Sequence, residues 1–582
     1  MTTQAIPRAP ARTRRFVEHA GLILSAVVIL WLLCCGLYLP LVLSAGLSSP
    51  SAFGLPAAIL LGLFFALFWL YAAYHLVVFA ASRLLRVARR EAPPGLLIAH
   101  GAPPVAILYT TMNDFDPAAA QSCLDQDYSN FRLFLLDDST DEQMRRQVDQ
   151  FASGQPGRAV VVRRRDRAGF KAGNLNHALR GPAAAFPFFA VVDADCVLPK
   201  DFVRQLVARL LADPDAAFVQ AACHSRSDEG RRLPAIMSPV VDIMWDTYIP
   251  YRERFGFTLL MGHGALVRRS AWDEVGGFPS IVAEDVGFAF ECRERGFRGL
   301  YAPHPVCYEA LPPTLGSYCG QQAKYSRGAC QWFWLYGRRA AFSTQLAWFE
   351  KLDLALFIFS NLLSGVFFLF LLFIGLVVPL VFYDIRVVRV GLAQYGFPWV
   401  ASIPHAELGR MLSWEFYGVS LLCIVAPLLS TLAMRGVRWK NRFLFLAWST
   451  MVHLSVIPQS LFETIRFLCT GKADFFVTGE RLSVSGGRRT GQGKVRAALD
   501  IASGVIFIAL ALLTGNPYLA AVGIAILIGM SMRALFETEQ PPRFWNAIAG
   551  MPLVLLALAV SQLGLGLISA QGTVFTIVPF HF

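Results

Sequence analysis

Long apolar runs at both ends of the chain constrain its fold more than any other feature of the sequence. A helix needs about 20 apolar residues to cross a bilayer, and runs of about that length lie at 20–45, 55–80, 352–382, 414–434, 498–514, 517–535 and 548–570. The composition, 55% hydrophobic and 16% charged, is too apolar for a soluble protein and too charged for one that lies wholly within a membrane. We therefore expect about seven membrane-spanning helices and a separate domain outside the bilayer.

Basic segments set the orientation of these helices. The segment "RAPARTRR" precedes the first run and "SRLLRVARR" follows the second, and lysine and arginine favour the cytosolic side of a membrane. This rule predicts a cytosolic N-terminal tail with two membrane helices in 1–82, a cytosolic domain in 83–350 and a membrane region in 351–582. The net charge of +12 reflects this bias in large part, and it also suits contact with an anionic surface or substrate.

The apolar stretch 443–468 has two readings. It contains His453, Pro458, Gln459, Glu463 and Arg466, which are unusual inside a lipid-facing helix. If it spanned the membrane, it would carry the basic loop 471–497 to the outside, against the charge rule. We therefore predict an interfacial or re-entrant helix, which keeps loop 471–497 in the cytosol.

The central block alternates short β-branched or aromatic runs with helical stretches. The predicted strands are "PVAILYTTM", "FRLFLLDDS", "RAVVVRRR" and "FFAVVDADC", and the predicted helices cover 141–152, 174–181 and 201–213. This alternation predicts an α/β domain with a mostly parallel sheet and helices on both faces. Ligands bind beyond the carboxyl ends of the strands in such sheets, which is where Asp137, Asp138, Asp193 and Asp195 fall.

The segment "VVDADCVLP" places Asp193 and Asp195 two positions apart, directly after a predicted strand. In an extended chain both side chains point the same way, so they can reach one cation. Carboxylates suit Mg²⁺ or Mn²⁺, which commonly bridges a few protein oxygens and the phosphates of a substrate. The alternative is a turn at a strand end with two solvated aspartates.

The cysteines and histidines do not indicate another metal centre. The eleven cysteines form no C-x-x-C pair, and several, such as Cys34, Cys35 and Cys423, lie in apolar runs. The ten histidines form no cluster with the spacing of metal ligands. We therefore expect free thiols, with neither a disulfide framework nor a zinc site.

Motifs in a fixed order surround the Asp193–Asp195 segment. "PPVAILYTTMNDFD", "LLDDST" and "RAGFKAGNLNHAL" precede it, and "MGHGALVRRSAWDEVGGF", "AEDVGFAFECRERGF" and "QQAKYSRGACQWFW" follow it. In this order the sequence resembles the family 2 glycosyltransferases over about 100–335, and within them the membrane-embedded processive polysaccharide synthases of the cellulose-synthase-like group. The resemblance implies a nucleotide-sugar-binding α/β domain of the GT-A type, held on the cytosolic side of a multi-pass protein of the bacterial inner membrane.

The resemblance also assigns residues to the sugar donor. It places Thr110, Asn113 and Asp114 at the nucleotide pocket, and Asp137 or Asp138 at the uracil or ribose. Lys171 would face the diphosphate. Asp193 and Asp195 would hold the diphosphate and its Mg²⁺ (or Mn²⁺).

The acidic pair Glu284 and Asp285 matches the motif that carries the general base in this family. The family motif usually begins with threonine, and Ala283 departs from it while both acids remain. Inverting transfer needs a carboxylate that takes the proton of the acceptor hydroxyl as the anomeric carbon is attacked. The alternative is favourable placement of acids near a helix N-terminus. We expect Asp285 to be the base and Glu284 to orient it or cap the helix.

The expected acceptor site departs further from its relatives. "QQAKY" stands where the family has Q-x-x-R-W, so Gln321 matches while Lys324 and Tyr325 replace arginine and tryptophan. Lysine keeps a positive charge but loses the bidentate fork, and tyrosine keeps an aromatic face for a sugar. His263 is a further acceptor-site candidate. "FFVT" resembles the F-x-V-T gating loop of cellulose synthases and would bring Thr478 to the diphosphate.

The resemblance of "QQAKY" and "FFVT" to motifs of glucan synthases implies a processive, inverting synthase that makes a β-linked glucan from UDP-glucose and moves it across the inner membrane. The linkage would be 1,3-, 1,4- or mixed. The expected partners of the synthase are the UDP-sugar, the growing polysaccharide, membrane lipids and export proteins of the periplasm or outer membrane, with no nucleic acid. The main alternative is a non-processive enzyme that glycosylates a lipid carrier. A transporter with a nucleotide-sensing domain has little support, because the apolar runs lack paired charges.

Overall fold

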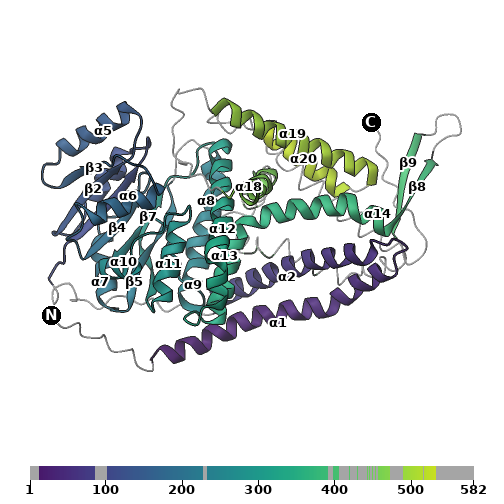
Figure 1. Cartoon of the computed structure of the whole chain (residues 1–582), viewed down its shortest axis with the longest axis horizontal. Helices are drawn as coiled ribbons and strands as arrows, with labels where there is room; N and C mark the ends of the chain where they lie inside the picture. The colour runs from purple at the N-terminus through teal and green to yellow at the C-terminus, as the bar shows by residue number, and fades with distance from the viewer. Residues whose placement is uncertain are drawn as a thin grey trace.

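A computed structural model describes most of the first two thirds of the chain and part of the last third. The described residues are 12–84, 101–226, 232–390, 397–404, 456–471, 489–514 and 517–531, with single positions between 419 and 453. An α/β domain forms one end of the molecule, and long helices extend away from it (Figure 1). Thr478, the run 548–570 and all but single positions of the run 414–434 lie outside the described residues.

The α/β domain is built on a seven-stranded sheet in the order β3-β2-β1-β4-β6-β5-β7. The predicted strands are confirmed as β1 (Val105–Thr111), β2 (Phe131–Asp137), β3 (Ala159–Val162) and β4 (Phe188–Asp193), and they pair in parallel. β5 (Ala216–Ser225) and β7 (Arg298–Glu309) are also parallel to each other. β6 (Ala265–Arg268) runs antiparallel between β4 and β5, so the sheet is mixed, a feature that the strand–helix alternation did not predict.

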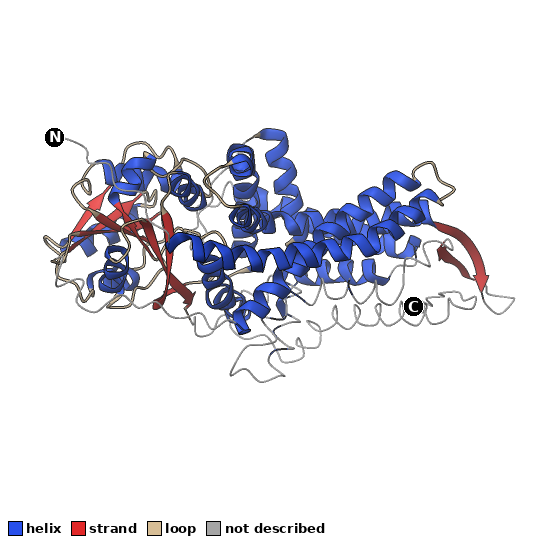
Figure 2. Cartoon of the chain, turned by 90° about the horizontal axis from the view of Figure 1, so that it is seen from below, coloured by secondary structure: helices blue, strands red, loops and turns tan. Residues whose placement is uncertain are grey.

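Helices cover both faces of this sheet (Figure 2). The three predicted helices are confirmed as α5 (Glu142–Ser153), α6 (Phe170–Arg180) and α7 (Phe202–Leu211). Aspartates cap two of the domain's helices, because Asp116 and Asp141 accept hydrogen bonds from the first backbone N–H groups of α4 (Pro117–Leu124) and α5. The remaining segments are α8 (Arg232–Ile243), the π-helical η1 (Met244–Tyr248), α9 (Ile249–Phe255), α10 (Arg269–Val275), α11 (Glu284–Glu294) and α12 (Leu315–Phe342).

Three helices among the described residues are long and apolar enough to cross a membrane: Gly21–Leu47, Gly54–Leu84 and Trp348–Val377. They belong to α1 (Arg12–Leu47), to α2 (Gly54–Leu84) and to α13 (Trp348–Leu372) with the π-helical η2 (Phe373–Val377). α14 (Val378–Phe382) continues η2 into a hairpin of β8 (Tyr383–Val390) and β9 (Phe397–Pro404). α19 (Arg489–Thr514) and α20 (Pro517–Ser531) follow, with a shorter apolar part at Ala498–Leu512. Seven spans are therefore not established in the described part of the chain.

α18 (Ile457–Thr470) forms the second half of the ambiguous stretch 443–468. It crosses close to α12 and α13 and is seen end-on in Figure 1. Ser460 Oγ lies 2.9 Å from Ser326 Oγ of α12, and Glu463 Oε2 lies 3.3 Å from Nη1 of the buried Arg327. Ser460 and Glu463 of α18 therefore face α12, the last helix of the α/β domain. The described part of this stretch is not among the helices long enough to span a membrane.

A buried charge network joins the apolar helices to the α/β domain. Asp353 of α13, which is 0% exposed, accepts hydrogen bonds from Tyr74 Oη at 2.7 Å and from the backbone N–H of Phe257 at 2.9 Å. Arg252 Nη2 lies 3.5 Å from the same carboxylate and donates to Tyr74 Oη at 2.9 Å. One carboxylate thus ties α13, α2 and α9 together.

Replacing Asp353 with asparagine should destabilise the protein strongly, because the buried Arg252 would lose its countercharge. Breaking one partner of a buried pair costs about 3–5 kcal/mol. Thermal unfolding of the detergent-purified protein, followed by intrinsic fluorescence, measures the effect. The matched control is Asp273→Asn, which removes an exposed helix pair with Arg269 worth about 0.3–0.5 kcal/mol. Equal melting temperatures for the two variants would show that the network does not hold these helices.

Candidate active site

The carboxyl ends of β1 and β4 bring the first group of polar residues together. Thr110 and Asp193 are register partners on these parallel strands, and Thr110 Oγ1 donates a hydrogen bond to Asp193 Oδ1 at 2.9 Å. Lys171, in the first turn of α6, contacts the same carboxylate oxygen and donates to the backbone oxygen of Gly262 at 2.8 Å. The structure therefore joins three of the predicted donor-site residues at the sheet edge where ligands bind in α/β folds.

The pair of Lys171 and Asp193 is ionised on both sides. Burial acts to raise the pKa of Asp193, but the positive charges of Lys171 and His263 outweigh it and lower that pKa to about 2. Burial acts to lower the pKa of Lys171, and the negative charge of Asp193 reverses the effect and raises it. A fixed ammonium group at this edge suits an anionic ligand such as a diphosphate.

Asp195 lies in a crowded acidic environment. Burial, together with the negative charges of Asp193 and Glu309, raises the pKa of Asp195 to about 8. His263 stands among these acids, with Nε2 at 3.0 Å from Glu309 Oε2 and Nδ1 at 3.9 Å from Asp193 Oδ2. Burial opposes its protonation, but the charge of Glu309 prevails and raises the pKa of His263 to about 10. The structure thus places His263 beside the Asp193–Asp195 segment.

Glu309 was not found by reading the sequence. It is the last residue of β7, it belongs to none of the quoted motifs, and the pairing of β7 with β5 and of Tyr308 with Val197 brings it to the site. The three carboxylates of Asp193, Asp195 and Glu309 repel one another, and a divalent cation would relieve this repulsion. The donor set at Asp193 and Asp195 is therefore one that fits Mg²⁺ or Mn²⁺.

The acidic pair opens α11 as expected. Ala283 precedes the helix without a side-chain cap, and Glu284 and Asp285 occupy its first turn. Asp285 Oδ1 accepts a hydrogen bond from the backbone N–H of Val286 at 2.8 Å. Its Oδ2 faces Gly262, where a Cβ atom would lie only 3.0 Å from that oxygen and the φ angle is +82°. The carboxylate of Asp285 therefore lies against the same glycine whose backbone oxygen receives the hydrogen bond from Lys171.

Both acids of this pair are harder to ionise than exposed carboxyls. Burial raises the pKa of Asp285. Burial and the charge of Asp285 raise the pKa of Glu284 to about 7, although the positive charges of Lys171 and Lys324 oppose the shift. A carboxylate whose pKa moves toward neutrality is better matched to general-base work.

α12 brings the predicted acceptor residues to the acidic pair. Gln331 Oε1 accepts a hydrogen bond from the N–H of Val282 at 2.9 Å, and Gly328 packs against Val282, which fixes α12 beside the start of α11. Lys324 interacts electrostatically with Glu284, and burial lowers the pKa of Lys324. Tyr325, the next residue, is 41% exposed and offers an open aromatic face.

Gln321 and Asn113 lie at two different parts of the site. Gln321 is half-buried, one helical turn before Lys324 on α12. Asn113 has a positive φ angle of 62°, and its Oδ1 accepts hydrogen bonds from the N–H groups of Thr140 and Asp141 at 2.8 and 2.9 Å. It therefore joins the loop after β1 to the loop after β2.

Asp114, which the sequence predicts at the nucleotide pocket, holds the loop after β1 in place. Asp114 Oδ1 accepts hydrogen bonds from Thr111 Oγ1 at 2.9 Å and from the N–H of Met112 at 2.7 Å, and burial raises the pKa of Asp114. These contacts keep the turn after β1 tight. The role of Asp114 toward a nucleotide stays a prediction.

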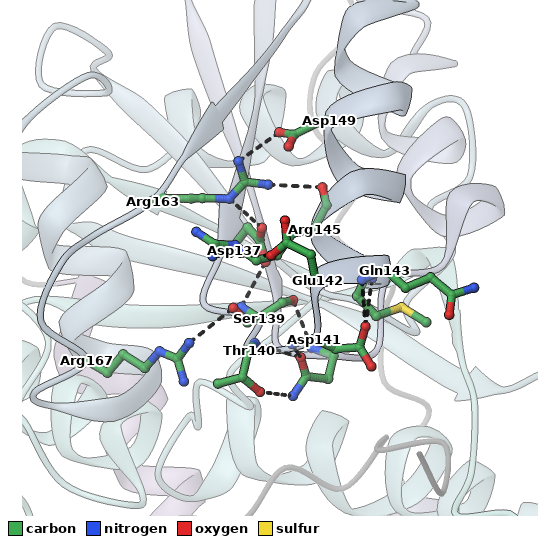
Figure 3. Close-up of polar contacts among 12 residues, drawn as sticks. Asp137, Ser139, Thr140, Asp141, Glu142, Gln143, Arg145, Asp149, Arg163 and Arg167 are labelled. Atoms are coloured by element: carbon green, nitrogen blue, oxygen red, sulfur yellow. Dashed lines mark hydrogen bonds and ion pairs between the residues drawn. The ribbon is translucent and has the colours of Figure 1, made fainter. Parts of the chain in front are cut away.

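Asp137 and Asp138 are each bonded to an arginine. Asp137 Oδ2 accepts from Arg163 Nε at 2.7 Å, in a network that includes Asp149 and Ser139 (Figure 3). Arg164 donates to both carboxylate oxygens of Asp138, with its closest contact at 2.7 Å. These ion pairs join the end of β2 to the residues after β3. The contact of Asp137 or Asp138 with the uracil or ribose stays a prediction.

Comparison with known proteins finds similarity to sugar-transferring enzymes over part of the chain. Residues 188–385 match the family model described as "Glycosyl transferase family group 2". A probable glucomannan 4-beta-mannosyltransferase of rice is 31% identical over 206 residues, which are 33% of this chain and 35% of that protein. The cellulose synthase catalytic subunit (UDP-forming) of Komagataeibacter sucrofermentans is 27% identical over 214 residues, which are 34% of this chain and 26% of that subunit.

Two further similarities extend over more of the chain. Glucans biosynthesis glucosyltransferase H of Xanthomonas campestris is 26% identical over 359 residues, 55% of this chain and 52% of that protein. A mannosyltransferase of Pyrobaculum calidifontis, solved with GDP-Man and Mn²⁺, superposes with a TM-score of 0.43 at 19% identity and covers 69% of this chain and 96% of its own. The chain thus spans about a third to a half of the rice and Xanthomonas relatives. Over these parts of its length the chain is similar to family 2 glycosyltransferases.

Proposed function

We propose that this protein is an inverting synthase that extends a β-linked polysaccharide with sugars from UDP-glucose and passes the product through its membrane helices. The observation that carries the proposal is the placement of Asp285 against Gly262, whose backbone oxygen binds Lys171 beside Asp193. This arrangement sets a candidate base next to a candidate diphosphate site. Named relatives include a cellulose synthase and a glucan glucosyltransferase, which supports a β-glucan product.

In the proposed reaction, the acceptor hydroxyl oxygen forms a bond to the anomeric carbon of the donor while the bond from that carbon to the diphosphate breaks. Asp285 takes the hydroxyl proton, and UDP leaves with the electron pair of the broken bond. Lys171 and Lys324 stabilise the negative charge that grows on the diphosphate. Glu284 keeps Asp285 oriented at the start of α11.

Asp193 and Asp195 would hold a divalent cation at the diphosphate. Bound there, Mg²⁺ or Mn²⁺ would supply positive charge to the leaving group. The residues of this chain prepare the place: Thr110 and Lys171 fix the carboxylate of Asp193, and the repulsion among Asp193, Asp195 and Glu309 favours cation binding.

In the proposed function, α12 and α18 keep the growing polysaccharide bound between successive sugar transfers. Tyr325 offers an exposed ring one position after Lys324, where a terminal sugar of the acceptor can stack. α12 contacts α18 through Ser326 and Arg327, so the acceptor site borders the helices that extend from the domain. An acceptor site next to these helices favours a growing polysaccharide as the acceptor over a lipid-linked sugar that is released after one transfer. We extend the proposal to Thr478, whose loop would close over the diphosphate.

Incubation of the purified protein with single nucleotide sugars tests the proposed function. UDP-glucose should yield long polymer that linkage-specific β-glucanases digest, whereas UDP-galactose and UDP-N-acetylglucosamine should yield none. GDP-mannose belongs in the panel because one relative is a mannosyltransferase. Polymer from GDP-mannose alone would overturn the donor assignment. A short, solvent-extractable glycolipid would overturn processive synthesis.

Replacing Asp285 with asparagine should abolish transfer, because only the proton acceptor is lost. Loss of a general base costs about 10²–10⁴-fold in rate, and UDP binding, measured by calorimetry, should stay close to that of the unchanged protein. Glu284→Gln is the matched control and should keep much of the activity. An Asp285→Asn variant that made polymer at a tenth of the normal rate would contradict this role.

The same pair predicts a pH dependence. The base acts when ionised, so kcat should fall as the pH drops through its pKa, and burial places that pKa above the usual aspartate range. The charge of Asp285 raises the pKa of Glu284, so Glu284 is still protonated at the pH where Asp285 ionises. Glu284→Gln should therefore leave the acid limb of the kcat profile in place. A clear shift of its midpoint in Glu284→Gln would contradict this order of ionisation.

Removing divalent cations should abolish synthesis, and adding Mg²⁺ or Mn²⁺ should restore it. Asp195→Asn should lower kcat/KM by at least about 100-fold, because charge at the leaving group is lost, and should weaken UDP-sugar binding. Asp215→Asn, at an exposed position away from the site, is the control. Full activity in excess EDTA would remove the cation from the proposed reaction.

A further inference from the structure

Three buried cysteines meet beneath the Asp193–Asp195 segment. Cys196, Cys223 and Cys307 are each 0% exposed, and their Sγ atoms all lie within 4.8 Å of one another. They come from the turn after β4, from β5 and from β7, so their positions in the sequence have no metal-binding spacing. From the sequence we expected free thiols without a zinc site. The thiols are free of disulfides, but the fold gathers three of them.

Strand pairing builds this cluster. Cys223 and Cys307 are register partners on the parallel strands β5 and β7, so their side chains leave the sheet on the same face. The bridge between Val197 and Tyr308, with N···O distances of 2.8 and 3.0 Å, holds the turn that carries Cys196 against the same end of β7. Each cysteine is therefore fixed by backbone hydrogen bonds of its own segment.

Gly264 leaves the space that the sulfurs occupy. A Cβ atom at this position would lie 2.5 Å from Cys223 Sγ and 3.6 Å from Cys307 Sγ, and the φ angle of +62° also favours glycine. Any side chain on this residue, directly before β6, would collide with the cluster. β6, the antiparallel strand that the sequence did not predict, thus begins directly after the glycine whose missing side chain leaves space for the sulfur atoms.

We propose that Cys196, Cys223 and Cys307 bind one thiophilic d¹⁰ cation, Zn²⁺ or Cu⁺. Metal–sulfur bonds of about 2.3 Å to three ligands place the sulfurs about 4 Å apart, which is within the spread of this cluster. Thiolates select soft metals, whereas the carboxylates of Asp193 and Asp195 suit hard ones. The two sites therefore take different ions.

The proposed ion has a structural role next to the catalytic segment. Cys196 directly follows Asp195, so a metal bound to its sulfur would tie the Asp193–Asp195 turn to β5 and β7. Because the thiols are buried, we expect the ion to enter during folding, as in other structural thiolate sites.

Metal content of the full-length protein tests this proposal independently of catalysis. The protein is produced in cells grown with Zn²⁺, with Cu²⁺ that the cells reduce to Cu⁺, or with Cd²⁺ as a soft probe ion, and is purified under reducing conditions. After loosely bound metal has been removed, each chain should hold about one such ion. Elemental analysis identifies Zn²⁺ or Cu⁺ as the ion taken up from unsupplemented medium. The double variant Cys223→Ser/Cys307→Ser should hold at least about tenfold less.

Cys292→Ser is the matched control, because Cys292 is a buried cysteine outside the cluster. It should retain the metal content of the unchanged protein. Equal content in the cluster variant and this control would overturn the proposal. If the cluster variant does not fold, the ultraviolet thiolate-to-metal absorption of the Cd²⁺-grown, unchanged protein decides: its presence supports the site, and its absence shows that the cysteines only fill space.

Discussion

The ion pair of Lys171 and Asp193 connects the parts of the molecule that meet at the carboxyl edge of the sheet. Lys171 comes from α6, Asp193 ends β4, and the backbone oxygen of Gly262 that also binds the ammonium group belongs to the loop before β6. Removing two charges from water is costly unless each is paired. The pairing therefore fixes the relative positions of these three segments, and Asp285 and His263 take their places around them.

The sequence predicted those parts of the structure that local patterns encode. The strands β1 to β4 carry short β-branched or aromatic runs. The segments of Asp193 and of Asp285 each hold two acids within a few residues, so their chemistry is visible without the fold. Glu309 and the three cysteines depend on the pairing of β5 with β7, between segments that are far apart in the sequence. β6 has only four residues and gives too short a pattern to recognise. The number of membrane spans rests on apolar runs, and three of these are established as long helices.

α12 links the candidate acceptor site to the helices outside the α/β domain. Lys324 of this helix interacts electrostatically with Glu284 of the acidic pair. Ser326 and Arg327, two and three positions further on, contact Ser460 and Glu463 of α18. Arg327 and Glu463 are both almost fully buried, so this pair is resistant to screening by salt. A displacement of α18 would therefore be transmitted to the residues beside Asp285. The segment that contains Thr478 follows α18 directly in the sequence.

The burial of Glu284 beside Asp285 has a consequence for repeated sugar transfer, if Asp285 acts as proposed. Each sugar added then leaves one proton on Asp285, next to a Glu284 that is only 6% exposed. A second sugar cannot be added by the same route until that proton has left. Glu284, with a pKa of about 7, lies next to Asp285 and can hold or release a proton near neutral pH. Resetting of the acid pair would then be a step of its own between successive additions, and the rate of chain growth would depend on proton escape as well as on the supply of sugar.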